Sequence, residues 1–195
     1  NINGIKLERN SDVMGLDYSA LRNLELVKSM GEGKRYGSLV WVLDKTQTPM
    51  GARMMGSWIK TPLQDIDKIN YRLDGVEELF KNPLLRSGVT EQLKFIRDTE
   101  RIAGKISNGN INPKDCLILG DSLSALPNVK LQLFGVSSKI LNDINDNIGD
   151  FGELASLLRN AIDPEASSIT KDGGYIKKGF DSELDRLRSI KENSS

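Results

Sequence analysis

The 195-residue sequence contains no histidine and a single cysteine. Without histidine, the chain lacks the commonest general base near neutral pH and the commonest metal ligand, and one cysteine excludes an internal disulfide. The chain also lacks net charge, because 27 basic residues balance 27 acidic ones. It therefore has no overall positive field to hold a nucleic-acid backbone, whose binding depends on neutralising phosphates.

Long apolar runs are missing as well. No stretch approaches the roughly 20 apolar residues that span a bilayer, and the first residues, Asn1-Ile2-Asn3-Gly4, do not resemble a signal peptide. We therefore expect a cytoplasmic protein. Because the sequence does not begin with Met, we also expect it to be part of a longer chain.

What the sequence does contain is helix signals. We expect Asp17 and Thr48 to cap helices, and Pro49 suits a first helical position because its missing N–H costs nothing there. We interpret the short apolar run 39–43 as helix, and expect Pro62 to end one helix and Pro127 to end or kink another. Apolar residues recur at helical spacing in these sets: Leu21, Leu24, Val27; Ile66, Ile69, Leu73, Val76, Phe80; Leu85, Val89, Leu93, Ile96, continuing to Ile102 and Ile106; Cys116, Leu119, Leu123, Leu126; Leu131, Phe134; Leu141, Ile144, Ile148; Phe151, Leu154, Leu158, Ala161; Leu184, Leu187, Ile190.

The predicted fold is therefore mainly α, a packed bundle of many helices. Ile5 and Leu7 alternate with charged residues, which predicts one short strand near the N-terminus. Residues 163–175, with two adjacent glycines, form the one long loop. The last helix, from Asp181, carries its charged face to the end of the sequence, and we expect the natural chain to continue beyond Ser195.

Residues 16–63 carry a family resemblance. They contain N-L-E-L, then G-S-L-x-x-V-L-D-x-T-x-T-x-M-G-x-R and W-I-x-x-P-L. These strings resemble the core domain of MutS DNA mismatch-repair proteins. The similarity extends along the chain through these further matches: Leu73 with Val76-Glu77-Glu78-Leu79, Asp98 with Glu100-Arg101, Pro113-Lys114-Asp115, Gly173-Gly174-Tyr175-Ile176 and Glu183-Leu184-Asp185. Thr99 departs from the family, which tends to carry Leu there.

The resemblance implies a domain division and a parent activity. Residues 1–178 correspond to the first segment of the MutS core domain, and residues 179–195 to the start of the lever helix that leads to a DNA clamp. The parent would be a dimeric ATPase, with ATP and Mg²⁺ bound outside this segment, that surveys duplex DNA for mispairs together with a MutL-type partner. The resemblance places the family's mismatch-reading Phe-x-Glu motif and its Walker nucleotide site in other domains. No Walker motif occurs here, and the Phe-x-Glu string Phe151-Gly152-Glu153 falls at the start of an expected helical segment.

One enzymatic alternative rests on two aspartates. Asp44 lies in D-K-T-Q-T, similar to the aspartyl-phosphate motif D-K-T-G-T, and Asp121 lies in G-D-S, similar to the magnesium motif of that phosphohydrolase superfamily. Gln47 replaces the glycine of the motif, however, and Asp121 falls within a helical pattern instead of at a strand end. We therefore expect Asp44 to cap a helix or to pair with a base, and we assign no catalytic, cofactor-binding or metal-binding residue.

Several other residues have a structural interpretation. Gly31-Glu32-Gly33-Lys34 is too short for a phosphate-binding loop and is followed by Arg35 where that motif needs Ser or Thr. We expect Trp41, Trp58 and Cys116 to pack in the core, although tryptophans can also stack on bases. A group of basic residues has a minor possible role near a DNA backbone: Lys34, Arg35, Lys171, Lys177 and Lys178.

Two functional hypotheses follow. In the first, the segment is mechanical and non-catalytic, and couples the position of the clamp to the ATPase through packed helices. In the second, it is a helical module that docks another repair factor or the partner subunit. The first predicts that Leu73→Ala or Trp58→Ala loosens the bundle by about 2 to 5 kcal/mol, provided that the side chain is fully buried.

Overall fold

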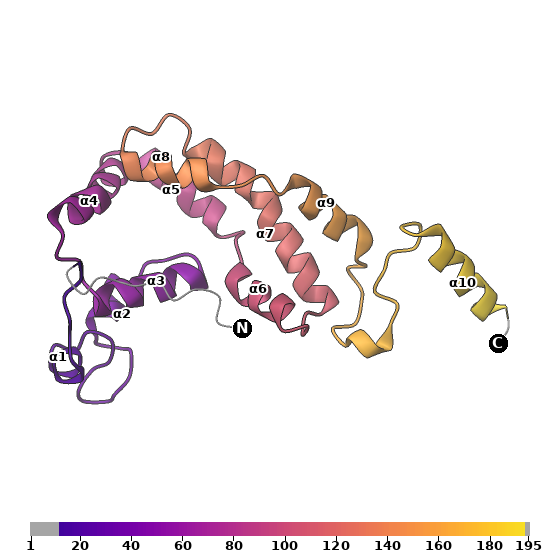
Figure 1. Cartoon of the computed structure of the whole chain (residues 1–195), viewed down its shortest axis with the longest axis horizontal. Coiled ribbons are helices and arrows are strands. Elements are labelled where there is room, and N and C mark those ends of the chain that lie inside the picture. Colours follow the sequence, from indigo (N-terminus) through magenta and orange to yellow (C-terminus); the bar gives the residue numbers. More distant parts are fainter. Residues whose placement is uncertain (1–11, 194–195) are drawn as a thin grey trace. The chain divides into compact units, whose positions relative to one another are not determined.

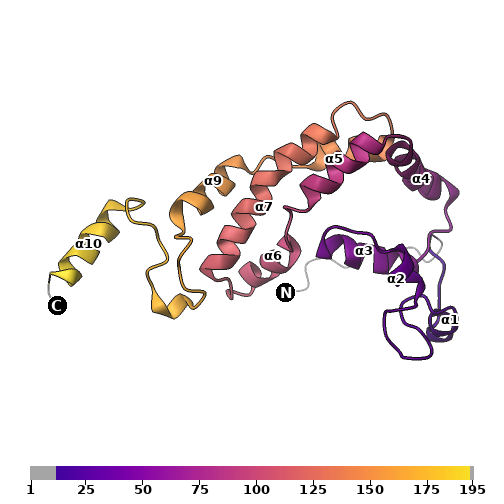
Figure 2. The same ribbon diagram turned by 180° about the vertical axis from the view of Figure 1, so that it is seen from behind.

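The computed structural model describes residues 12–193, which form ten α-helices and two isolated β-bridges (Figures 1 and 2). The mainly α fold is confirmed. The predicted strand at Ile5 and Leu7 lies outside the described residues. The described residues divide into two compact units, one comprising residues 12–93 with 132–147 and the other residues 94–131 with 148–193.

The first unit contains six helices: α1 (Tyr18–Asn23), α2 (Leu39–Leu43), α3 (Pro49–Lys60), α4 (Ile66–Lys81), α5 (Pro83–Leu93) and α8 (Lys139–Asn147). The predicted caps are confirmed at Asp17 and Thr48, whose side chains accept hydrogen bonds from the N–H groups of Ala20 and Gly51. Helix α4 packs against α8 and α5, and α2 packs against α3. Near the start of the described chain, Val13 forms an antiparallel bridge with Leu63.

Helix α1 is shorter than the sequence predicts. The helical spacing of Leu21, Leu24 and Val27 suggested one continuous helix, but Glu25 adopts a positive φ of 49° and ends the helical path. Its carboxylate then accepts the Met30 N–H at 2.5 Å, which turns the chain into the irregular segment before α2. Leu24, one of the three predicted stripe residues, is exposed, whereas Leu26, outside the stripe, is buried.

The contact between α4 and α8 depends on a glycine. Gly75 is the buried residue of α4, and a Cβ at that position would overlap the Ile140 side chain of α8. A hydrogen bond also joins the two helices: the Tyr71 hydroxyl of α4 donates to the Asp143 carboxylate of α8 at 2.7 Å. Gly75 therefore lowers the helix propensity of α4 but allows α4 and α8 to approach closely.

The large apolar stripe of α4 faces away from this contact, which corrects the prediction that it forms the core. Leu73 is 54% exposed and Phe80 is 76% exposed, and Ile66 and Val76 are exposed as well. The spacing of the stripe was correct, but the described chain supplies no element that covers it. Amphipathic spacing identifies an apolar helix face without identifying what packs on it.

Both tryptophans also lie nearer the surface than predicted. Trp41 is 45% exposed and its ring centroid lies 4.6 Å from that of Tyr36. Trp58 is 38% exposed, and the Arg72 guanidinium carbon lies 3.6 Å from its ring centroid. The two rings therefore make local contacts, one with an aromatic ring and one with a cation, in place of a fully buried core.

The second unit contains α6 (Thr99–Ser107), α7 (Pro113–Gln132), α9 (Gly152–Ala161), a 3₁₀ turn (Thr170–Asp172) and α10 (Ser182–Glu192); only Gln132 at the end of α7 belongs to the first unit. Helices α6 and α9 lie beside α7 in both views (Figures 1 and 2). The core of this unit includes Ile102, Ala125, Val129 and Ala155.

Two predicted boundaries in this part of the sequence are wrong. The stripe from Leu85 to Ile106 is not one helix, because the chain leaves helical geometry after Leu93 and Asp98 caps a new helix through the Arg101 N–H. Pro127, expected to end or kink a helix, lies inside α7, which continues to Gln132. Leu131, predicted to begin another segment, is part of α7 and exposed.

Candidate functional site

The start of α10 is held by side chains that reach outside the helix. The Asp185 carboxylate accepts the Gly179 N–H at 2.6 Å, across the turn that precedes the helix. Arg188 donates to the Ile176 carbonyl at 2.9 Å, and its guanidinium lies 3.6 Å from Asp185. These contacts fix the orientation of α10 relative to residues 176–179.

Residues 176–179 are in turn bound to α9. Ile176 forms an antiparallel bridge with Ile162, directly after the end of α9. The Lys177 ammonium donates to the Arg159 carbonyl at 2.6 Å, where a cation suits the negative end of the helix dipole. A displacement of α10 is therefore opposed by contacts to the last turn of α9.

Helix α9 then packs closely on α7. A Cβ at the buried Gly120 of α7 would lie only 3.2 Å from the Leu158 Cβ atom of α9. On the other side of α7, Lys105 of α6 forms two hydrogen bonds with the Asp115 carboxylate, at 2.7 and 2.8 Å. The contacts thus form a continuous path from α10 through α9 and α7 to α6.

Asp44, one of the two aspartates of the enzymatic alternative, has a structural role in the first unit. Its carboxylate accepts the Thr46 hydroxyl at 2.6 Å and the Thr46 N–H at 3.0 Å, and it pairs with Arg35. These hydrogen bonds from Thr46, with the nearby Arg35 charge, lower the pKa of Asp44. The prediction that Asp44 pairs with a base is confirmed.

Asp121, the second aspartate, lies in the middle of α7 and forms an ion pair with Arg159 at 3.6 Å. The phosphohydrolase motif requires this acid at the end of a parallel strand, and in residues 12–193 the β structure consists of two isolated antiparallel bridges. The enzymatic interpretation of Asp44 and Asp121 is therefore contradicted by their secondary structure.

The comparison with known families bears on the whole arrangement. A family model described as MutS domain III matches residues 19–193. The chain belongs to this family. Its MutS relatives include the DNA mismatch repair protein MutS of Clostridium perfringens, 44% identical over 193 residues, 99% of this chain and 21% of that protein. The protein of the same name from Methanosarcina barkeri is 43% identical over 197 residues, 99% of this chain and 22% of that protein.

The MutS domain III chain spans about a fifth of the length of these relatives. A third, the DNA mismatch repair protein MutS of Lachnoclostridium phytofermentans, is 41% identical over 181 residues, 93% of this chain and 19% of that protein. The resemblance seen in the sequence motifs is thus confirmed over nearly the whole chain, as a helical domain of mismatch repair proteins.

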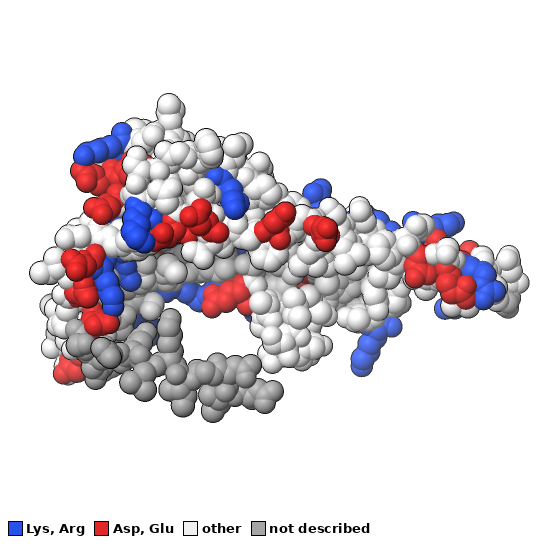
Figure 3. Space-filling model, turned by 45° about the horizontal axis from the view of Figure 1, so that its top comes forward, with Lys and Arg blue, Asp and Glu red and all other residues white. Residues whose placement is uncertain are grey.

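Most basic residues considered for contact with a DNA backbone have partners inside this MutS domain. Lys34 pairs with Glu32 at 2.9 Å, Arg35 pairs with Asp44, and Lys177 binds the Arg159 carbonyl. Lys171 and Lys178 are exposed. On the face seen in Figure 3, acidic and basic side chains are interspersed, as expected for a chain without net charge.

Cys116 is half-buried on α7, and burial, followed by the neighbouring Asp115 charge, raises the pKa of its thiol. A raised pKa disfavours the reactive thiolate. Within residues 12–193 no cluster of three or more acidic or cysteine side chains has the arrangement to hold a metal ion. In the same range, no helix is both long enough and apolar enough to cross a membrane.

Sequence reasoning missed the polar contacts that hold the helices together. Glu78 of α4 accepts the N–H groups of Ser137 and Ser138 at 2.6 and 2.7 Å, before the first turn of α8. Hydrogen bonding from Ser138 and Ser137 lowers the pKa of Glu78. Glu183-Leu184-Asp185 matched the family pattern, but one sequence contains no signal that Asp185 reaches back to Gly179.

Proposed function

We propose that this chain is a non-catalytic core and lever segment of a longer MutS-type protein and transmits motion between the DNA clamp and the ATPase of that protein. The observation that carries the proposal is the path of contacts from α10 to α6. A helix transmits displacement because its backbone hydrogen bonds are internal, and side-chain contacts pass the displacement to the next helix. The proposed ligand and cofactors, mismatched duplex DNA with ATP and Mg²⁺, bind to other parts of the longer protein.

The proposal assigns residues 1–178 to the core and residues 179–195 to the start of the lever. Gly179 has a φ of 87°, a conformation that favours glycine, and Asp181 then caps α10 through the Leu184 N–H. A turn followed by a capped helix is a natural boundary between two mechanical elements. The longer protein would work in the cytoplasm as a dimer, with a MutL-type partner.

Asp185→Ala in the full-length protein tests the relay. This substitution removes the link between α10 and Gly179, so we expect the stimulation of ATP hydrolysis by mismatched DNA to fall about fivefold or more. ATP affinity and the hydrolysis rate without DNA should stay within about twofold of the parent, since the nucleotide site lies elsewhere. Steady-state hydrolysis with and without G·T heteroduplex measures both quantities.

Glu183→Ala is the matched control for this experiment. Glu183 is an exposed acid of the same first turn, and its ion pair is with Arg186 three residues along the same helix. Its removal should leave the mismatch response unchanged. A normally folded Asp185→Ala protein with the full mismatch response would contradict the relay.

The exposed face of α4 favours a second function, a helical interaction module. Large apolar side chains outside a core mark contact surfaces, and this face contains Ile66, Leu73, Val76 and Phe80. A pull-down with the 195-residue chain separates the two functions, because a relay has no reason to bind a repair factor alone. Specific capture of such a factor that is lost in Phe80→Ser would favour the docking module.

A further inference from the structure

The first unit contains a hollow surface in which all charged side chains are positive. One hollow, of about 490 Å³, lies between α1 and the segment that follows it, and Arg22 and Lys28 are its charged residues. A second, of about 360 Å³, is lined by Lys28, Arg35, Arg53 and Lys60. The two hollows share Val27 and Lys28 and therefore adjoin. We call them together the basic groove.

The charge of the basic groove differs from that of the chain. Five of its lining residues are cationic and none is acidic, although the whole sequence has equal numbers of acids and bases. One of the five cations, Arg35, is paired with the neighbouring Asp44, and the Glu25 carboxylate accepts the Met30 N–H. Within the described residues, Lys28 and Lys60 have no carboxylate partner. The basic groove therefore has unneutralised positive charge.

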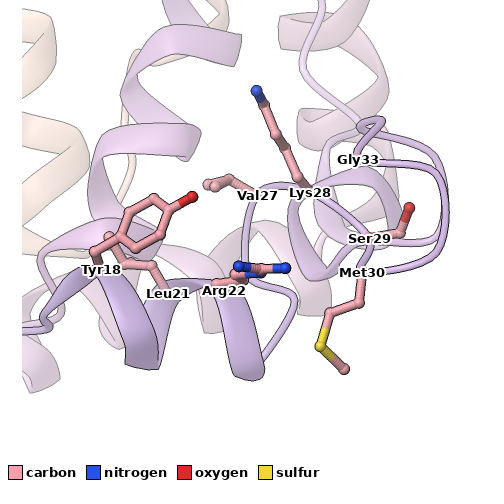
Figure 4. A pocket seen from close by; sticks show the side chains of 8 residues that line it. All are labelled: Tyr18, Leu21, Arg22, Val27, Lys28, Ser29, Met30 and Gly33. Carbon is pink, nitrogen blue, oxygen red and sulfur yellow. The ribbon is translucent and has the colours of Figure 1, made fainter.

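The basic groove also has apolar walls. Tyr18, which is 77% exposed, and Met30 lie at one end, and Val40 and Ala52 line the other. Figure 4 shows the Tyr18 ring pointing toward Val27, while the Lys28 ammonium extends away from α1. A ligand in the basic groove thus meets large apolar side chains as well as cations.

One face of α3 lines the second hollow. Arg53, Gly56 and Lys60 recur at three and four residues and so share one helix face. Arg53 and Lys60 are seven residues apart, which is about 10 Å along the axis. Gly56 lies between them, and a Cβ there would meet nothing within 4 Å. This face can accept an extended chain with negative groups at both ends.

We propose that the basic groove binds an acidic protein segment that carries large apolar side chains between its carboxylates. Phosphate groups alone would match the cations but would leave the exposed side chains of Tyr18 and Met30 without a partner. A base can stack on the Tyr18 ring, but the aliphatic Met30 and Val27 side chains suit an apolar side chain better. The mixed lining therefore favours a peptide over a nucleic acid. This docking site is independent of the relay proposed above, because none of its residues belongs to the path from α10 to α6.

Fluorescence anisotropy with the full 195-residue chain tests the proposal. The probe is a labelled peptide of about eight residues in which Asp and Glu alternate with Phe and Leu, long enough when extended to span the basic groove. We expect saturable binding that weakens with rising salt. A peptide with Ser in place of every Phe and Leu should bind about tenfold more weakly, because it loses the apolar contacts.

Charge reversal locates the binding site. Lys28→Glu with Lys60→Glu should weaken peptide binding about tenfold or more. The matched control, Lys114→Glu with Lys178→Glu, changes the net charge equally at exposed residues of the other unit and should bind as the parent does. Circular dichroism checks the fold of each variant, and the single substitution Lys28→Glu in the loop replaces the double one if the latter fails to fold.

Four results would overturn the proposal. Equal binding by both double variants would show non-specific attraction, and absence of binding at low salt would show that the groove holds no such segment. Tighter, lysine-dependent binding of a labelled oligothymidylate of the same charge would make the groove a phosphate site. Sedimentation that shows self-association, lost in the Lys28→Glu, Lys60→Glu variant, would identify a second copy of the chain as the occupant.

Discussion

Helices α4 and α7 differ in how far they bury their large apolar residues. On α4, five large apolar residues recur at ideal spacing, yet the residue that is buried is Gly75. On α7, the predicted stripe of large residues is only half-buried, while small residues such as Gly120, Ser122 and Ala125 are buried. Both helices thus make their internal contacts through small side chains.

This difference in exposure indicates which large apolar residues stabilise the chain itself and which are available to contact another surface. Small residues let helices approach closely and resist relative displacement, which suits a relay within one domain. Large apolar residues that stay exposed, such as Phe80 on α4, contribute little to the stability of this chain and are available to another surface. Substitutions on the two kinds of face should therefore have very different effects.

Gly75→Val should have the largest effect on stability. The added side chain overlaps Ile140 of α8, and overpacking of this kind costs up to about 3 kcal/mol. Urea unfolding followed by circular dichroism measures the loss. Gly104→Ala on α6 is the control, because a Cβ there meets nothing within 4 Å, and we expect it to gain up to about 1 kcal/mol from helix propensity. Equal changes in the free energy of unfolding for the two substitutions would contradict the claim that the buried Gly75 permits the contact between α4 and α8.

Ser122→Ala on α7 should cost about 2 kcal/mol in the free energy of unfolding. The buried Ser122 hydroxyl accepts the Arg97 N–H at 3.0 Å and donates to the Ile118 carbonyl at 2.8 Å, so its loss leaves a backbone N–H without a partner. Ser156→Ala, at an exposed position of α9, should change little. A neutral Ser122→Ala would mean that this small polar residue fills space on α7 without holding the segment that leads into α6.

Glu78→Gln should cost about 1 kcal/mol near neutral pH, because the charged carboxylate caps the N-terminus of α8. The pKa of Glu78 is lowered in the folded chain from its ordinary 4.5. Its stabilising contribution is therefore fully present above about pH 5 and is lost as pH falls through the lowered pKa. Urea unfolding of both proteins between about pH 3 and pH 7 should show the difference shrinking in acid.

Glu77→Gln is the control for Glu78, since Glu77 pairs only with Lys81 on the same exposed face of α4. Its effect should be at most about 0.5 kcal/mol, as for other helix pairs four residues apart. A pH-independent loss in Glu78→Gln would show that its charge is not what holds α8.

Leu73→Ala should have the smallest effect in this chain, within about 0.5 kcal/mol, because the side chain is largely exposed. This revises the expectation of 2 to 5 kcal/mol, which required full burial. In the full-length protein the same substitution should cost about 2 kcal/mol or more if another domain covers α4. Paired unfolding measurements on the chain and the full-length protein make the comparison, and equal small losses would show that this face stays free.

Helix identity and most helix starts could be predicted from the sequence, because caps and spacing are local. Asp17, Thr48, Asp65 and Asp181 all accept hydrogen bonds in the first turn of their helices. The early end of α1 was missed because a positive φ at Glu25 is rare and leaves no local signal. For Pro127 the sequence left two outcomes open, an end or a kink, and the structure shows that α7 continues past it to Gln132.

Burial was the weakest part of the prediction. Helical spacing identified the apolar face of α4, but periodicity alone does not show whether a neighbour exists. The contacts of the proposed relay could not be predicted from the sequence either. The hydrogen bonds between Asp185 and Gly179 and between Lys177 and Arg159 depend on how the chain folds back on itself. The family, by contrast, was predictable, because its motifs are ordered strings over residues 16–63.

The central claim is that this chain transmits a mismatch signal and does not read the mismatch. Fluorescence anisotropy of labelled homoduplex and G·T heteroduplex DNA, titrated with the 195-residue chain at low and physiological salt, tests it most directly. The account predicts either no binding or weak, salt-sensitive binding that is equal for the two duplexes. A clear preference for the heteroduplex would show that the segment reads bases itself and would contradict the mechanical assignment.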